Sequence, residues 1–129
     1  MAEINLPQEW IILAERDLST ALHLANTMVP VPIEIVCFHC QQAAEKYLKS
    51  FLQLHGKTPS YIHDLIELRK QCEKYESKFS EVAENCKTLT AYGVQPRYNL
   101  GMQLEETDMN LALKNAQSLK EFIKAIIQF

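Results

Sequence analysis

The sequence predicts an all-α protein, an antiparallel, up-and-down bundle of five helices that forms one domain over residues 1–129. Hydrophobic residues make up 47% of the chain and only 3 residues are glycine, a composition that suits helices and disfavours a turn-rich β-fold. Apolar residues recur at helical spacing in five segments, separated by prolines, glycines and capping residues. A length of 129 residues is enough for one domain with its own core.

The first two helices are expected to form a hairpin. The first should run from about Leu6 to Met28, with Asn5 as its N-cap and Pro7 in its first turn. Residues 29–32, Val-Pro-Val-Pro, break this helix because each proline disfavours helical geometry in the residue before it. The second helix is expected over Pro32–Gly56 and should be the central helix of the bundle.

The central helix is predicted to be apolar over most of its circumference. Its broad apolar arc consists of Val36, Cys37, Cys40, Ala43, Ala44, Tyr47, Leu48, Phe51, Leu52 and Leu54. The opposite, polar arc consists of His39, Gln42, Glu45, Lys46, Lys49 and Gln53. Glu45 precedes Lys49 by four residues, which is the favourable order for a helical ion pair. Gln41 falls inside the apolar arc and is expected to be a buried amide bonded to backbone.

Two apolar residues, Ile35 and Phe38, interrupt the polar arc near the N-terminal end of the central helix. Exposed apolar groups often mark a contact surface, so we expect another subunit to cover this end.

The remaining helices are shorter, except the last. The third should begin near residues 63–64, where Asp64 suits the positive end of the helix dipole. Ser77 is expected to be the N-cap of the fourth helix, which should end around residues 92–93. The longest irregular segment follows at residues 93–101, with glycine at both ends and proline inside. The last helix is expected over Glu105–Gln128.

Charge and cysteine usage favour a cytoplasmic protein. A net charge of −3 and a pI near 5.8 argue against broad, nonspecific binding to nucleic acid or anionic membranes. The N-terminus lacks the features of a signal peptide, and no apolar run approaches membrane-spanning length. We therefore expect a cytoplasmic location, no membrane partner and reduced cysteines.

The cysteine pattern also permits a zinc-site interpretation, because two of the four cysteines form a Cys-x2-Cys pair around His39. However, structural zinc sites usually place such a pair in a turn, whereas this pair lies within a predicted helix. All four cysteines occupy inward positions, where free cysteine packs as a small hydrophobe. We expect core packing, no bound metal and no disulfide for Cys37, Cys40, Cys72 and Cys86.

Three separated motifs, in the same order along the chain, resemble those of one family. Residues 38–49, Phe-His-Cys-Gln-Gln-Ala-Ala-Glu-Lys-Tyr-Leu-Lys, resemble the FHxQQAAEKxLK signature of the HEPN domain family. Residues 63–65, His-Asp-Leu, resemble that family's HDL motif. Residues 89–92 followed by residues 97–98 resemble its LTxY…RYP segment, with Asn99 in place of the usual proline. The similarity extends from Trp10 to the last helix.

The resemblance implies a helical bundle that is usually a homodimer in the prokaryotic cytoplasm. Many family members are encoded beside a minimal nucleotidyltransferase and act as the toxin of a toxin–antitoxin pair. The family name reflects a proposed role in nucleotide binding. Other branches are metal-independent ribonucleases, whose site is an Arg followed after four to six residues by His in the C-terminal half. No histidine follows Arg97 in this sequence, so the nuclease activity does not carry over.

The matched motifs also define a candidate ligand site. Lys46, His63 and Arg97 together would hold a phosphate, since Arg97 lies in a glycine-flanked loop and His63 opens a helix with free N–H groups. Tyr92 or Tyr98 would stack on a base. The complete set of candidate ligand-binding residues is His39, Gln42, Lys46, His63, Arg97 and Tyr98. No cofactor is expected, and no catalytic residue is identified. In the alternative interpretation these side chains form a polar network that only fixes the loop or the dimer.

Arg16 and His23 also form an Arg-x6-His pair, but in the first helix rather than in the C-terminal half. We interpret them as two exposed side chains, because a motif outside its structural context carries little weight.

The three matched motifs favour a homodimeric HEPN-family protein that binds a nucleotide or RNA phosphate and works with a nucleotidyltransferase. The alternative is a non-catalytic, homodimeric helical interaction protein.

Overall fold

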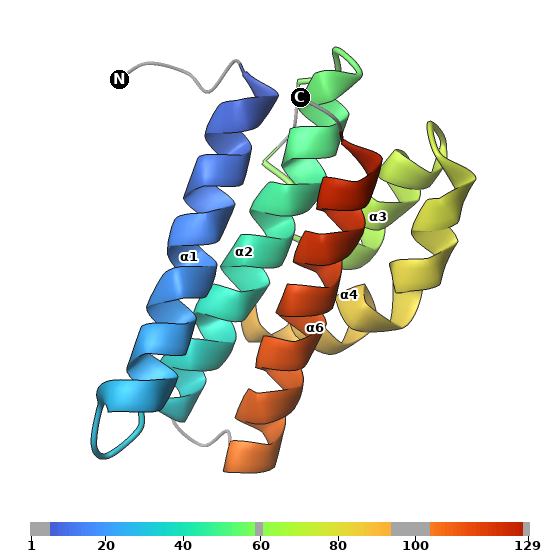
Figure 1. The fold of residues 1–129 in the computed structure, drawn as a ribbon. Coiled ribbons are helices and arrows are strands. Elements are labelled where there is room, and N and C mark those ends of the chain that lie inside the picture. Colours follow the sequence, from blue (N-terminus) through green and yellow to red (C-terminus); the bar gives the residue numbers. More distant parts are fainter. Residues whose placement is uncertain (1–5, 59–60, 94–103, 128–129) are drawn as a thin grey trace.

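The computed structural model describes residues 6–58, 61–93 and 104–127, and within these ranges every regular element is helical. Figure 1 shows three long helices side by side, with shorter helical segments on the side of α2 away from α1. The expected all-α bundle of five helices is confirmed. In chain order the elements are α1 (Pro7–Thr27), α2 (Ile33–Leu54), α3 (Leu65–Glu73), the 3₁₀ segment η1 (Ser77–Val82), α4 (Ala83–Thr90), the 3₁₀ segment η2 (Ala91–Gly93) and α6 (Glu106–Ile126).

The helix α2 is central, because it packs against α1, α3, α4, η2 and α6. The helices α1 and α2 form an antiparallel hairpin, whereas α6 runs alongside α2 in the same direction after the excursion through α3, η1 and α4 (Figure 1). None of the helices in the described ranges is long and apolar enough to cross a membrane.

The predicted apolar arc of α2 forms the core of the bundle. Its members are buried from Val36 to Leu52, but Leu54, the last residue of α2, is 43% exposed. The expectation for Leu54 was wrong because the helix extends past the partners that cover its apolar side. Gly56 then leaves the helix with φ of +75°, a conformation that glycine adopts without a Cβ penalty.

The start of α1 differs from the prediction. Leu6 occupies the N-cap position and its side chain makes no capping hydrogen bond, while Pro7 is the first helical residue. Asn5, the expected cap, lies outside the described residues. Because proline has no N–H to satisfy, Pro7 removes one of the donors that a capping side chain would otherwise have to meet.

The predicted fourth helix is divided into η1 and α4. Ser77 is the first residue of the 3₁₀ segment and not an N-cap; the N-cap is Glu76. The tight segment brings Phe79 into the core, where its ring centroid lies 4.6 Å from that of Phe51 and 5.0 Å from that of Phe122. The sequence prediction missed this division because hydrophobic periodicity alone does not distinguish a 3₁₀ turn from an α turn.

The four cysteines lie in the core, as expected from their inward positions. Burial raises the pKa of the Cys37, Cys40 and Cys86 thiols to about 12, and also raises the pKa of Cys72. The Cys72 thiol points at the backbone oxygen of Leu48, 3.5 Å away. Among the described residues, no group of three or more His, Cys, Asp and Glu side chains is arranged to hold a metal ion.

Candidate functional site

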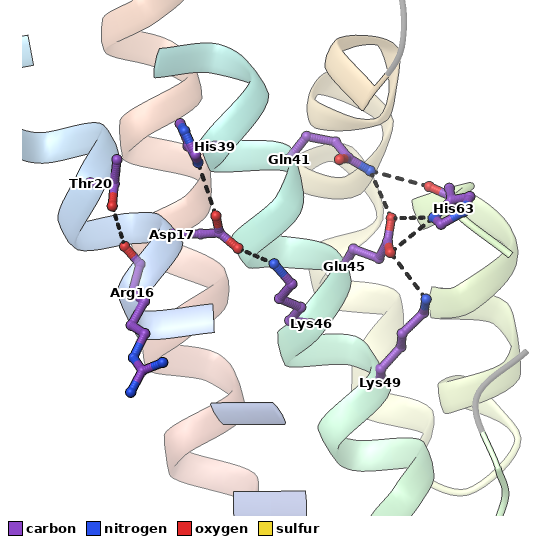
Figure 2. A network of polar contacts seen from close by, with 9 residues as sticks. All are labelled: Arg16, Asp17, Thr20, His39, Gln41, Glu45, Lys46, Lys49 and His63. Atoms are coloured by element: carbon purple, nitrogen blue, oxygen red, sulfur yellow. Dashed lines mark hydrogen bonds and ion pairs between the residues drawn. The ribbon is translucent and has the colours of Figure 1, made fainter. Parts of the chain in front are cut away.

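Two carboxylates on opposite flanks of α2 each bind one histidine and one lysine (Figure 2). The first set, here called the Asp17 cluster, consists of Asp17, His39 and Lys46. The second, the Glu45 cluster, consists of Gln41, Glu45, Lys49 and His63. Together they contain three of the residues that the sequence predicts for a ligand site: His39, Lys46 and His63.

The Asp17 cluster lies between α1 and α2. Asp17 Oδ1 is 2.9 Å from His39 Nδ1, and Asp17 Oδ2 accepts a hydrogen bond from Lys46 Nζ. His39 and Lys46 are seven residues apart, so α2 presents both toward α1. Burial alone would raise the pKa of Asp17, but the hydrogen bonds from His39 and Lys46 and the charge of Lys46 outweigh it and lower that pKa. Asp17 is therefore held as an anion that orients both partners.

The Glu45 cluster lies between α2 and the segment that leads into α3. Glu45 Oε2 is 3.0 Å from Lys49 Nζ, and both carboxylate oxygens lie within 3.1 Å of His63 Nδ1. The Glu45 and Lys49 side chains are each only 6% exposed, whereas the His63 side chain is 66% exposed. Lys49 Nζ also lies 5.5 Å from the centroid of the Trp10 ring, a cation–π contact. An almost fully buried ion pair thus supports an imidazole that reaches solvent.

Gln41 links the Glu45 cluster to two chain segments. It is fully buried, and its Nε2 donates to the His63 backbone oxygen at 3.2 Å and to Glu45 Oε1 at 3.4 Å. The prediction of a buried amide bonded to backbone is confirmed. Its side chain also packs against Gly93, where an added Cβ would lie 3.2 Å from the amide carbon. One side chain therefore touches residues that are thirty positions apart in the sequence.

At the start of α3, two of the N–H groups that the sequence suggested for an anion have hydrogen-bond partners. Asp64 is the N-cap, and its carboxylate accepts from the N–H of Ile66 at 2.9 Å. The N–H of Leu65 donates to Thr90 Oγ1 at 3.0 Å. These two donors are therefore already occupied, and the Asp64 carboxylate would repel an anion at this helix end.

The polar arc of α2 is also more enclosed than a solvated helix face. Glu45 and Lys49 form the expected i,i+4 pair, but they are buried beneath Trp10 and the chain around His63. Gln42 is half-buried, and helical geometry places it between the two clusters on the circumference of α2. The two flanks and Gln42 therefore form one continuous polar strip.

The structure brings the candidate residues together only in part. His39 and Lys46 share Asp17, whereas His63 binds Glu45 on the other flank and does not join them. Arg97 and Tyr98, like Asn99, lie outside the described residues. Tyr92, the other candidate for base stacking, is 7% exposed and lies in the core.

Asp17 is the residue that the sequence interpretation missed. It lies three residues after Ala14 and four before Ala21, both fully buried, so it borders the inward stripe of α1. A carboxylate at such a border position is a usable signal for a partner on the facing helix. By contrast, Arg16 and His23 are exposed, in agreement with their interpretation as surface side chains.

The fold is an all-helical bundle, and its central helix carries the first and longest of the three sequence motifs. Together these two features define the class of protein. The HEPN domain family model matches residues 7–126, and the chain belongs to this family. No curated protein sequence matches the chain.

Solved structures that share the fold include two crystal structures. The crystal structure of TT1696 from Thermus thermophilus has a TM-score of 0.81 at 22% identity, covering 96% of this chain and 100% of that one. The crystal structure of ST0689, described as an archaeal HEPN homologue, has a TM-score of 0.75 at 23% identity, covering 97% of this chain and 100% of that one. At these identities the likeness applies to the fold alone.

Proposed function

We propose that this HEPN-domain protein binds a nucleotide or an RNA phosphate along the polar strip of α2. In this proposal it is a cytoplasmic homodimer, and it acts as the toxin-like partner of a minimal nucleotidyltransferase. The ligand contacts come from His39, Gln42, Lys46 and His63, with Arg97 and Tyr98 completing the site.

The observation that supports this function best is the setting of His63. Its side chain is 66% exposed, yet its Nδ1 is fixed by a carboxylate that is only 6% exposed. Burying the Glu45–Lys49 pair carries a desolvation penalty, and replacing such a pair with apolar residues is often neutral or stabilising. A buried pair beneath an exposed, oriented imidazole is better explained by a task of the imidazole than by core stability.

The charges of the strip are consistent with a phosphate ligand. In each cluster the lysine and the carboxylate balance one another, so the charge of the histidine decides the net charge of the cluster. A protonated His39 or His63 makes its cluster positive and supplies an N–H for a phosphate oxygen. Arg97 would add a planar, bidentate donor that a lysine does not reproduce.

The alternative function, a non-catalytic homodimeric helical interaction protein, is favoured by one specific observation. Lys46 and Lys49 already have carboxylate partners, so neither is a free cation waiting for a ligand. In that alternative the clusters only tie α1 and the His63 segment to α2. The two functions differ in whether any phosphate-bearing ligand binds the folded protein.

Thermal-shift measurements with nucleotides and short RNAs test the proposal directly. A ligand that binds only the native state stabilises it by about 2.7 kcal/mol at a concentration 100 times its Kd. We expect Arg97→Lys and His63→Gln to reduce the shift while leaving the melting temperature of the free protein nearly unchanged. His23→Gln, at an exposed position outside both clusters, is the matched control and should keep the full shift.

Two outcomes would decide against ligand binding. One is the absence of a shift with every nucleotide and RNA tested. The other is an Arg97→Ala variant that fails to fold while no ligand is found, which would support the structural alternative. A gene for a small nucleotidyltransferase next to that of this protein would support the proposed partner.

A further inference from the structure

The buried Glu45 carboxylate contacts Nδ1 of His63, whose side chain is largely exposed. We propose that Glu45 and Gln41 are positioning residues: Glu45 fixes the tautomer and ring orientation of His63, and Gln41 fixes the His63 segment relative to Gly93. This inference rests on the proposed function, because it assigns the phosphate contact of that site to Nε2 of His63.

The role of Glu45 follows from the hydrogen bonds that it makes. Its two oxygens lie 3.0 and 3.1 Å from His63 Nδ1, and Lys49 Nζ lies 3.0 Å from Oε2. A carboxylate beside an ammonium group is an acceptor only, so the hydrogen between Glu45 and His63 belongs to Nδ1. Nε2 is then the open nitrogen of the ring: it accepts a hydrogen bond when the ring is neutral and donates one when the ring is protonated.

Lys49 contributes to the same orientation by restraining the carboxylate. Its Nζ binds Glu45 from within α2 and lies against the Trp10 ring, so the carboxylate is held by a second partner besides His63. With both side chains 6% exposed, little room remains for Glu45 to change its rotamer. The ring of His63 is thereby oriented before any ligand arrives, which reduces the entropy lost on binding.

The role of Gln41 follows from its contacts with two segments. Its Nε2 donates to the backbone oxygen of His63, and its amide group packs against Gly93. Arg97 follows Gly93 by only four residues. A single buried amide therefore fixes the distance between the segment that carries His63 and Gly93. Its Oε1 is buried and has no hydrogen-bond partner among the described residues, so within them the contact depends on packing and on Nε2.

The tautomer of His63 is measurable in the free protein by long-range ¹H–¹⁵N correlation spectra of the imidazole rings. We expect the neutral ring of His63 to carry its hydrogen on Nδ1, and Glu45→Gln to raise the population with hydrogen on Nε2. Asp17→Asn is the matched control, because Asp17 also binds one histidine and one lysine. It should alter the signals of His39 and leave those of His63 unchanged. A neutral His63 with its hydrogen on Nε2 in the unsubstituted protein overturns the role of Glu45.

Binding of inorganic phosphate and AMP supplies the second measurement. We expect Glu45→Gln to weaken the binding of either anion tenfold or more, because a phosphate oxygen accepts from Nε2 of the protonated ring and that ring loses its carboxylate partner at Nδ1. If the tautomer is as expected but neither anion binds the unsubstituted protein, the proposed function fails while the positioning by Glu45 stands. If an anion binds and Glu45→Gln changes the tautomer without weakening binding, the assignment of the contact to Nε2 is wrong.

Gln41→Met tests the second positioning residue, since methionine keeps the length of the side chain but removes the donor. We expect shifts in the backbone amide signals around both His63 and Gly93. Shifts confined to one of the two segments would contradict the linking role. If Glu45→Gln does not fold, the tautomer in the unsubstituted protein still decides the role of Glu45.

Discussion

Asp17 and Glu45 have the same kinds of partners but different exposure. The Asp17 cluster remains partly open, with side-chain exposures of 14% for Asp17, 22% for Lys46 and 26% for His39. In the Glu45 cluster the ion pair is closed off and only His63 reaches solvent. Solvent therefore screens the first cluster more than the second, and substitutions in the first are better tolerated by the fold.

Asp17→Asn should destabilise the protein near neutral pH by about 1–3 kcal/mol, because it removes the charge from two hydrogen bonds. The pKa of Asp17 in the folded protein lies below the ordinary value of 3.8. The unfolded chain therefore takes up the proton first as the pH falls. The stabilisation by Asp17 is complete above the ordinary value and is lost as the pH falls through the folded-state pKa.

Urea denaturation of the unsubstituted protein and of Asp17→Asn, at neutral pH and at successively lower pH, measures this difference in free energy of unfolding. The difference should shrink at acid pH. Glu81→Gln, at an exposed carboxylate in η1, is the control and should change the stability little at any pH. A difference for Asp17→Asn that stays constant with pH would show that the carboxylate charge is not the cause.

The apolar residues that α2 buries were predictable one by one, but the burial of Glu45 and Lys49 and the partners from other segments were not. The wheel position of Gln41 inside the apolar arc predicts burial, and the spacing of Glu45 and Lys49 predicts their pair. Asp17 and His63 are far from α2 in the sequence, and helical periodicity within one segment carries no information on which flank of another helix they meet. The division of the candidate site into two clusters therefore required the structure.

At the scale of elements, two glycines illustrate different constraints. Gly56 has φ of +75° and open space around its α-carbon, so a side chain there costs backbone strain only. Gly93 does not have a positive φ, but a Cβ at this position would meet the Gln41 amide at 3.2 Å. Gln41 is fully buried and hydrogen-bonded, and it has little freedom to move aside.

Gly93→Ala should therefore destabilise the protein by a net amount of about 1 kcal/mol. Replacing glycine with alanine at a compatible φ usually stabilises by about 0.4–1 kcal/mol through the unfolded state. Overpacking against a rigid side chain costs about 1–3 kcal/mol and should outweigh that gain. The penalty should nearly vanish in a Gln41→Ala background, where the added methyl group has room.

A double-mutant cycle with Gly93→Ala and Gln41→Ala, measured by urea denaturation, isolates this coupling. Gly56→Ala is the contrasting control: it should lose about 1 kcal/mol through backbone strain and show no coupling to Gln41. Additive effects of Gly93→Ala and Gln41→Ala would mean that the two residues do not constrain one another.

The long helices and the start of α3 were predictable from the sequence, whereas the division of the segment after α3 was not, for a physical reason. The helices α1, α2 and α6 have several turns of consistent apolar spacing, so their extents agree with the prediction to within a few residues. The segment from Ser77 to Gly93 winds first as 3₁₀, then as α, and again as 3₁₀. Phe79 in this segment packs against Phe51 and Phe122, which are tertiary contacts that local periodicity does not reveal.

At the scale of the whole molecule, the fold is set by the burial of α2 on nearly all sides. Such a helix needs neighbours around its circumference, and α1, α3, α4 and α6 supply them within one chain. The two ends of α2 are exceptions, because each leaves an apolar side chain exposed. In the first turn Ile35 is 45% exposed. At the other end of the same helix Leu54 is 43% exposed. The motif similarity that identifies the family does not indicate which end meets a partner.

The last prediction concerns that choice: we expect a homodimer whose interface includes Ile35. Light scattering after size-exclusion chromatography should give about twice the chain mass of 14.9 kDa at micromolar concentration. Ile35→Glu should convert the protein to a monomer, because the interface would then bury an unpaired charge. The fold of each chain should persist, since Ile35 is partly exposed within one chain.

Leu54→Glu is the control for this prediction. Leu54 lies on the same helix and is nearly as exposed, and its substitution should leave the dimer intact. A single-chain mass for the unsubstituted protein would rule out the dimer, and loss of the dimer in Leu54→Glu alone would move the interface to the opposite end of α2.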